Sequence, residues 1–186
     1  MGQDLPVTSF ALLGLFTFGD DDGPRSLTGY ELKQVADATL RFYWVSPAMS
    51  QVYKELSRLA ERGLVSPSDD ERGTTYSITS AGRSALETWM RESEPGFSVL
   101  KHPIALRLLL GHLVDPSTTL AMLRNHLEAL DREREALVEV RESLRGADAP
   151  RQTFRHPSLV ADWGLEYFAH ERLIIDDLIR RIDQDE

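Results

Sequence analysis

The polar residues of one short segment, 46–62, are of the types that bind nucleic acid. When the segment is placed on a helix at about 100° per residue, Val52, Leu56 and Leu59 fall on one face. The opposite face carries hydroxyl, amide and charged side chains: Ser50, Gln51, Lys54, Arg58, Glu61 and Arg62. Glutamine can pair with adenine and arginine with guanine, whereas lysine and hydroxyl groups bind phosphates. A polar face on an isolated helix is most often a solvated surface, so the neighbouring elements must decide whether this helix reads DNA.

No comparable pattern for catalysis or metal binding is found. The chain has no cysteine, which excludes a thiolate nucleophile, a disulfide framework and a thiolate metal site. It has neither a G-x-S-x-G elbow nor a phosphate-cradling glycine loop. The histidines show no paired spacing typical of metal ligands; they are His102, His112, His126, His156 and His170. The sequence therefore predicts no enzyme, no metal site and no cofactor.

Two helices are expected before the 46–62 segment. The first covers residues 8–18, with Thr8 or Ser9 as its N-cap, and is apolar on most sides. The second extends to about residue 40 and has Thr28 as its N-cap. Both are expected to pack against the apolar stripe of the segment that follows.

A hairpin is expected after the segment. Ser46 is expected to cap the 46–62 helix, with Pro47 at its first helical position, and Gly63 to end it. Two short β-prone runs follow, over residues 64–68 and 74–79, joined by the polar connector DDERG. The hairpin would form the wing of a DNA-binding domain.

A fourth helix completes the first half of the chain. Thr79 is expected to cap it, with Ala85, Leu86 and Trp89 facing inward. Three helices, a two-stranded wing and a further helix are the order of a winged helix-turn-helix domain, which we place at residues 1–95. In that context the 46–62 helix becomes the expected recognition helix.

Residues 96–186 have the pattern of a second, helical domain. A short apolar helix over 102–113 is expected to end at Asp115-Pro116, and two long amphipathic helices follow, over 117–145 and 157–182. Their apolar stripes are too long for a domain of this size to cover alone, so a second copy of the chain is the expected cover. The residues expected to form this homodimer interface are Leu120, Leu123, Leu127, Leu130, Leu137, Ile174 and Leu178.

Charge and hydropathy limit the partners of the chain. The net charge of −9 argues against a surface that binds nucleic acid everywhere, so any DNA-binding face must be small. The start of the chain lacks the cationic region of a secretory signal, and the run IALRLLLGHLV is far short of the about 20 residues needed to cross a bilayer. We therefore expect a cytoplasmic protein with no membrane partner. Its expected fold class is mainly α, with a small β-hairpin wing.

Several segments resemble one known family. ALLGLFTFG, TGYELKQ, SQVYKELSRLAERGLV and TTYSITSAGR have the order and spacing found in PadR-type transcriptional regulators. The most specific matches are Ser50, Tyr53 and Leu56 in the third helix and Tyr76, Ile78 and Thr79 at the end of the wing. The C-terminal half is similar to the subgroup with a virulence-activator-like α-helical dimerisation domain. The resemblance implies a homodimeric repressor that binds a partly palindromic operator in double-stranded DNA and releases it when a small molecule binds.

The resemblance and the residue chemistry together suggest a DNA-binding set. Its members are Ser46, Ser50, Gln51, Tyr53, Lys54 and Arg58 on the third helix and Arg72, Thr74, Thr75 and Tyr76 on the wing. Because Arg72 is the one basic residue just before the wing threonines, Thr74 and Thr75 are expected to act through their hydroxyl groups. A winged-helix module that binds protein instead of DNA is the alternative; it would expose apolar side chains around Lys54 and Arg58.

An aromatic cluster on the last helix has two interpretations. Trp163, Tyr167 and Phe168 lie close together in the sequence. They would either belong to the dimer core or form one wall of a pocket for an apolar or aromatic effector, since ligand pockets in helical bundles are often built from such residues.

Overall fold

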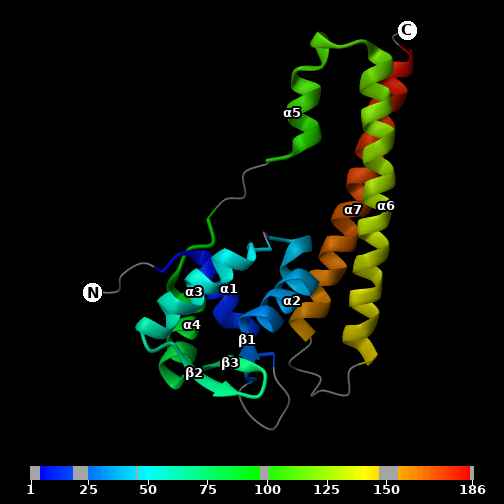
Figure 1. Ribbon diagram of the computed structural model, residues 1–186. Helices are drawn as coiled ribbons and strands as arrows, with labels where there is room; N and C mark the ends of the chain where they lie inside the picture. The colour runs from blue at the N-terminus through cyan, green and yellow to red at the C-terminus, as the bar shows by residue number, and fades with distance from the viewer. Residues whose placement is uncertain (1–4, 19–24, 45, 97–100, 147–154, 185–186) are drawn as a thin grey trace. The chain divides into compact units, whose positions relative to one another are not determined.

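The computed structural model describes residues 5–18, 25–44, 46–96, 101–146 and 155–184. The chain divides into two compact units, Met1–Pro95 and Gly96–Glu186 (Figure 1). The expected mainly α class with one small sheet is confirmed. Among the described residues, no helix is long and apolar enough to cross a membrane.

The described residues of the first unit form four α-helices around one apolar core. They are α1 (Val7–Leu15), α2 (Gly29–Thr39), α3 (Met49–Glu61) and α4 (Ser80–Glu92), with a short 3-10 helix η1 (Leu40–Phe42) after α2. The core contains Leu12 of α1, Phe16 directly after it, Leu32 of α2, and Leu56 and Leu59 of α3, all fully buried. The inward face expected for α3 is therefore confirmed, and its polar face points away from this core.

The wing belongs to a three-stranded antiparallel sheet. Its strands are β1 (Leu27–Thr28), β2 (Val65–Asp70) and β3 (Gly73–Ile78), in the order β1-β3-β2. The expected hairpin is confirmed, with Val65 opposite Ile78 and Asp70 opposite Gly73. Gly73 has a φ of 101°, a conformation that favours glycine at the turn. Strand β1 was not expected, because two residues are too few to produce a strand pattern.

Local capping confirms the starts of α2 and α4. Thr28 accepts a hydrogen bond from the backbone N–H of Glu31, and the Glu31 carboxylate accepts one from the backbone N–H of Thr28, which completes a capping box. Thr79 accepts a hydrogen bond from the N–H of Gly82 (3.0 Å) and so caps α4. A Cβ on Gly82 would lie 2.0 Å from the carbonyl oxygen of Leu64, so only glycine fits there.

The expected caps of α1 and α3 are wrong. Helix α1 begins at Val7 after Pro6, and neither Thr8 nor Ser9 caps it. Helix α3 begins at Met49, with Ala48 in the N-cap position and no side-chain cap. The hydroxyl of Ser46 instead donates to Asp37 (2.5 Å). Ser46 thus lies two residues before the N-cap position and binds a carboxylate on α2 instead.

The second unit is a pair of long helices with a short one at its start. Its elements are α5 (Pro103–Leu109), the 3-10 helix η2 (Gly111–Leu113), α6 (Pro116–Gly146) and α7 (Arg155–Gln184). Helices α6 and α7 run antiparallel, side by side (Figure 1). Ion pairs link them, Arg141 with Asp162 (2.7 Å) and Arg172 with Asp131 (2.5 Å).

The boundary between α5 and α6 differs from the expectation in one detail. Pro116 was expected to end the preceding helix, but it is the first residue of α6. Asp115 accepts a hydrogen bond from the backbone N–H of Thr118 (2.8 Å), as an N-cap residue does. Hydrogen bonds from Ser117 and Thr118 lower the pKa of Asp115 from 3.8 to about 2.

Candidate nucleic-acid interface

Helix α3 presents a polar surface to solvent. Ser50, Gln51, Tyr53 and Lys54 are exposed, whereas Val52 on the opposite face is fully buried. Ser50 and Gln51 lie in the first turn and Lys54 one turn later. An amide, an ammonium and two hydroxyl groups are therefore available together along one side of the helix.

Arg58 is held by a carboxylate that is itself buried. Glu55 is 4% exposed, accepts a hydrogen bond from the hydroxyl of Ser9 on α1, and binds Nη1 of Arg58 at 2.7 and 2.8 Å. The side chain of Glu55 therefore lies on the buried side of α3 and not on its exposed polar face. Because Arg58 is half-buried in this pair, it must reorganise before it can pair with a base.

A hollow of about 460 Å³ lies between the start of α2, helix α3 and strand β3. It is lined by Thr28, Tyr30, Glu31, Tyr53, Arg72, Thr74 and Tyr76. Tyr30 is 59% exposed and was missed by sequence reasoning, although its position two residues after the expected cap Thr28 could have indicated it. A Cβ on Gly29 would lie 2.5 Å from the ring of Tyr53, so this glycine allows the ring to pack against α2.

The cation of the wing is already paired. Arg72 binds Asp70 through Nη2 (2.8 Å) and Glu31 through Nη1 (3.2 Å). The pairing with Arg72 lowers the pKa of Asp70. The pKa of Glu31 is lowered mainly by the backbone N–H of Thr28, with a smaller effect of Arg72.

The two wing threonines differ in exposure. Thr74 is exposed, and its hydroxyl donates to Asp69 (2.8 Å). Thr75 is 2% exposed, and its hydroxyl donates to the carbonyl of Ser68 (3.0 Å). Tyr76 is half-buried against the core and lines the hollow. Of the residues predicted on the wing, Thr75 is thus the one whose hydroxyl points away from solvent.

Solved structures of similar shape are known. The PadR-like transcriptional regulator BC1756 from Bacillus cereus matches with a TM-score of 0.77 and 18% identity, over 96% of this chain and 99% of that one. Bacillus subtilis PadR in complex with operator DNA matches with a TM-score of 0.77 and 22% identity, over 95% and 99%. The same protein in complex with p-coumaric acid has a TM-score of 0.71 and 21% identity, over 98% and 99%. The Vibrio cholerae virulence activator AphA has a TM-score of 0.71 and 20% identity, over 96% and 99%.

The chain has the PadR-like fold. Both the winged-helix half and the long-helix half take part in these matches, because they cover nearly the whole chain. The resemblance expected from the sequence segments is therefore confirmed at the level of fold. No protein-family model matches the sequence, and no curated protein matches it.

Within the PadR-like fold, the expected dimer leucines are largely covered by the chain itself. Leu120, Leu123, Leu130 and Leu137 are at most 6% exposed in the single chain. The other members of the expected set differ: Leu127 and Leu178 are half-buried, and Ile174 is 60% exposed. Helix α7 covers much of the α6 stripe, and the larger exposed apolar side chains lie on other faces.

The aromatic cluster lies on the surface of α7. Trp163 is 70% and Tyr167 48% exposed, and the rings of Tyr167 and Phe168 are 6.1 Å apart. Burial, followed by the charge of Glu171 and a hydrogen bond with it, raises the pKa of Tyr167. A hollow of about 460 Å³ in this unit lies elsewhere, against α5 and α6, and is lined by Ile104, Arg107, Thr118, Ala121, Met122, Asn125 and His126.

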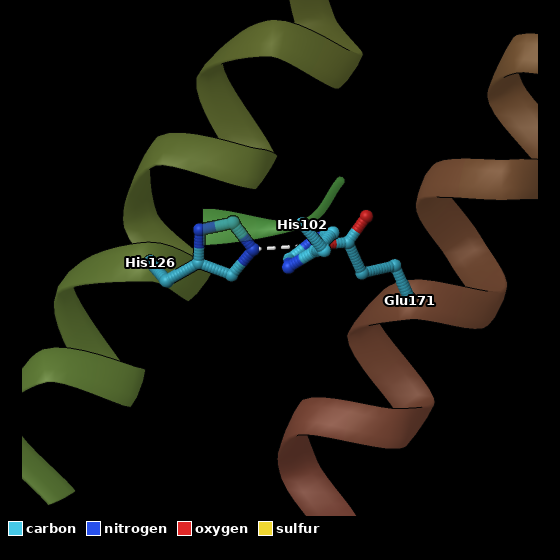
Figure 2. A group of neighbouring side chains, drawn as sticks. All are labelled: His102, His126 and Glu171. Carbon is cyan, nitrogen blue, oxygen red and sulfur yellow. Dashed lines mark hydrogen bonds and ion pairs between the residues drawn. The ribbon is translucent and has the colours of Figure 1, made fainter. Parts of the chain in front are cut away.

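Three potential metal ligands meet in the second unit. His102, directly before α5, His126 on α6 and Glu171 on α7 place their ligating atoms within 4.8 Å of one another (Figure 2). The sequence predicted no metal site because its histidines lack a paired spacing. The two histidines lie 69 and 45 residues from Glu171, so only the packing of three separate elements brings the group together.

Proposed function

We propose that this protein is a homodimeric transcriptional regulator, and specifically a repressor. It would bind a partly palindromic operator through α3 and the wing, and release it when an apolar or aromatic small molecule binds. The observation that carries the proposal is the exposed Ser50, Gln51 and Lys54 face of α3, in a fold that Bacillus subtilis PadR shows in complex with operator DNA. A DNA partner implies a cytoplasmic location.

Each part of the surface has a distinct role in this proposal. In the major groove, Gln51 would contact a base edge, whereas Lys54 would bind a phosphate. Tyr30 and Tyr53 border the hollow with exposed side chains, so their hydroxyl groups would donate to the backbone of the DNA. Arg72 would contribute less, since Asp70 and Glu31 already compensate its charge.

The alternative, a protein-interaction module, is less consistent with the same surface. Such a module would bury apolar side chains against its partner, yet α3 exposes Gln51, Lys54 and Ser57 around its centre. Tyr53 is the large apolar ring exposed there, and tyrosine is equally suited to a phosphate edge. The proteins of similar fold are regulators, which also supports a binding role over catalysis.

Dimerisation is proposed through the exposed apolar side chains of the second unit. Helix α7 exposes Leu159 (56%), Trp163 (70%), Leu173 (65%) and Ile174 (60%). Large apolar groups that gather on a surface mark interaction sites. A second copy of the chain would cover them and bring two α3 helices to two half-sites.

The proposal is tested with DNA taken from upstream of the protein's own gene. In an electrophoretic shift assay, the protein should bind this duplex in preference to a scrambled duplex of equal length. p-Coumaric acid is the first effector to test, because a crystal structure of Bacillus subtilis PadR in complex with it is known. It should reduce binding of the protein to the DNA. Equal binding to both duplexes at all salt concentrations would exclude specific operator recognition. If the protein binds this DNA specifically and phenolic acids do not change the binding, the proposed role as a DNA-binding regulator is kept, but phenolic acids are excluded as its effectors.

A further inference from the structure

We propose that His102, His126 and Glu171 form a binding site for a divalent transition-metal ion, with zinc as the best match. Figure 2 shows the two imidazoles and the carboxylate directed toward one another from three elements. Oε1 of Glu171 lies 2.6 Å from Nε2 of His102 and 2.6 Å from Nε2 of His126. All three residues are at least partly buried, and Glu171 is 9% exposed.

The donor set selects the class of ion. Two imidazole nitrogens and one carboxylate oxygen suit zinc, cobalt(II) and nickel(II), whereas calcium and magnesium prefer oxygen ligands. Three protein ligands leave a fourth tetrahedral position for water or another small ligand. Bonds of about 2.0–2.2 Å to the ion would set neighbouring donor atoms about 3.3–3.6 Å apart in a tetrahedron. Each nitrogen would therefore move about 0.7–1.0 Å from the carboxylate oxygen, which is 2.6 Å away, as the ion enters.

The three ligands are supported by apolar packing in the same unit. Ile104 lies two residues after the first histidine, Leu123 three residues before the second, and Ile175 four residues after the glutamate. These three side chains form one buried cluster. Because each ligand thus has a packed neighbour on its own element, only small side-chain adjustments are needed to admit an ion.

Two further features fit an ion site. His126 also lines the hollow of about 460 Å³ against α5 and α6, which gives water and small ligands access to the fourth position. Glu171 also acts electrostatically on Tyr167, whose pKa is raised by burial and by the charge of this carboxylate, so Tyr167 lies near the proposed ligand.

The hydrogen bonds of His102 define what the ion would change. Its Nδ1 accepts a long hydrogen bond from the N–H of Ala105 (3.4 Å), which leaves the proton on Nε2 to be donated to Glu171. An ion on Nε2 requires the proton on Nδ1, so this weak cap of α5 would be given up. In the metal-free protein the carboxylate is satisfied by the histidines, and the ion would replace their protons.

The test uses the full-length protein, freed of any polyhistidine tag, and cobalt(II) as the probe. Four-coordinate cobalt(II) absorbs strongly in the visible range, so a titration should show one ion bound per chain, displaced by one equivalent of zinc. Zinc should also raise the melting temperature. If the wild-type protein binds neither cobalt(II) nor zinc at one ion per chain, the proposal is overturned, whatever the variants show.

Three single variants assign the ligands: His102→Gln, His126→Gln and Glu171→Gln. Loss of a residue that only hydrogen-bonds to a metal ligand typically weakens metal binding by about 10- to 100-fold. Each of these variants removes a ligand itself and should weaken binding by more than that. His170→Gln is the matched control, since His170 is an exposed histidine on α7 and should bind as the wild type does. His102 lies at the edge of the unit, so His102→Gln keeps the assignment testable if the other two variants unfold. Unchanged affinity in folded His102→Gln would place the ion elsewhere and contradict the site.

Discussion

Glu55 is the residue that most changes how α3 is understood. Its spacing from Val52 and Leu59 places it on the buried stripe, yet a carboxylate is normally expected at the surface. The structure resolves the conflict because Ser9, 46 residues earlier, and Arg58 together satisfy the buried oxygens. Helical spacing is consistent with the buried position of Glu55, but the distant partner that makes a buried carboxylate tolerable, Ser9, cannot be identified from the sequence.

The first prediction concerns this carboxylate. Glu55→Ala should lower the free energy of unfolding by about 1–3 kcal/mol, because it leaves the Ser9 hydroxyl and Arg58 without their acceptor. The exposed Glu61 on the same helix serves as the control, and Glu61→Ala should stay within about 0.5 kcal/mol of the wild type. Urea unfolding followed by circular dichroism measures both. Equal midpoints for the two variants would contradict the buried role of Glu55.

At the scale of elements, features that depend on residues nearby in the sequence were predicted correctly, whereas features that depend on contacts between distant segments were not. Thr28 and Thr79 cap their helices as expected, because each cap depends on residues only three positions away. Ser9 lies inside α1 and Ser46 lies three residues before α3, so neither is at a cap position; their hydroxyl groups donate to Glu55 and Asp37 on other helices. The same limit applies to the candidate sites. The polar face of α3 follows from periodicity, whereas the hollow beside it and the cluster around Glu171 arise only when separate elements pack.

Two helical glycines give opposite predictions for one substitution. Gly82→Ala in α4 should destabilise the first unit by about 1–3 kcal/mol, because the new Cβ would lie 2.0 Å from the carbonyl of Leu64. Gly14→Ala in α1 meets no atom within 4 Å and should stabilise by about 0.5–1 kcal/mol through the higher helix propensity of alanine. Chemical denaturation of the two variants tests this difference in sign. A stabilised Gly82→Ala protein would be incompatible with the packing of α4 against Leu64.

The start of α6 should respond to acid. The pKa of Asp115 is lowered from 3.8 to about 2, so the charged form is favoured in the folded protein. Its contribution to stability is therefore complete above the ordinary pKa and is lost as the pH falls from about 4 to about 2. Carboxyl NMR should find this titration near 2, and Asp115→Asn should reduce the loss of stability over the same interval. A measured pKa close to 3.8 would show that Ser117 and Thr118 do not hold the carboxylate in solution.

At the scale of the whole molecule, the proposed dimer would form through exposed apolar side chains of the second unit. Leu123 and Leu137 are buried within the single chain and cannot contact a second copy. We therefore expect the interface at exposed residues such as Trp163 and Ile174. Light scattering should give about twice the chain mass of 21.0 kDa. Ile174→Asp should shift the protein toward the monomer, whereas Met90→Asp, at a 70% exposed position in the first unit, should leave the dimer intact. A wild-type monomer at micromolar concentration would exclude the proposed assembly.

The central claim, that α3 reads DNA, is tested most directly by the salt dependence of operator binding. Fluorescence anisotropy would compare the wild type with a protein carrying both Gln51→Ala and Lys54→Ala, with Lys101→Ala as a control that removes an exposed lysine from the second unit. We predict weaker operator binding by the double variant, and a salt slope smaller by about 0.9 for each phosphate that the protein no longer neutralises. The control should match the wild type in both respects. A folded double variant with unchanged operator affinity and unchanged salt slope would show that α3 is not the reading helix.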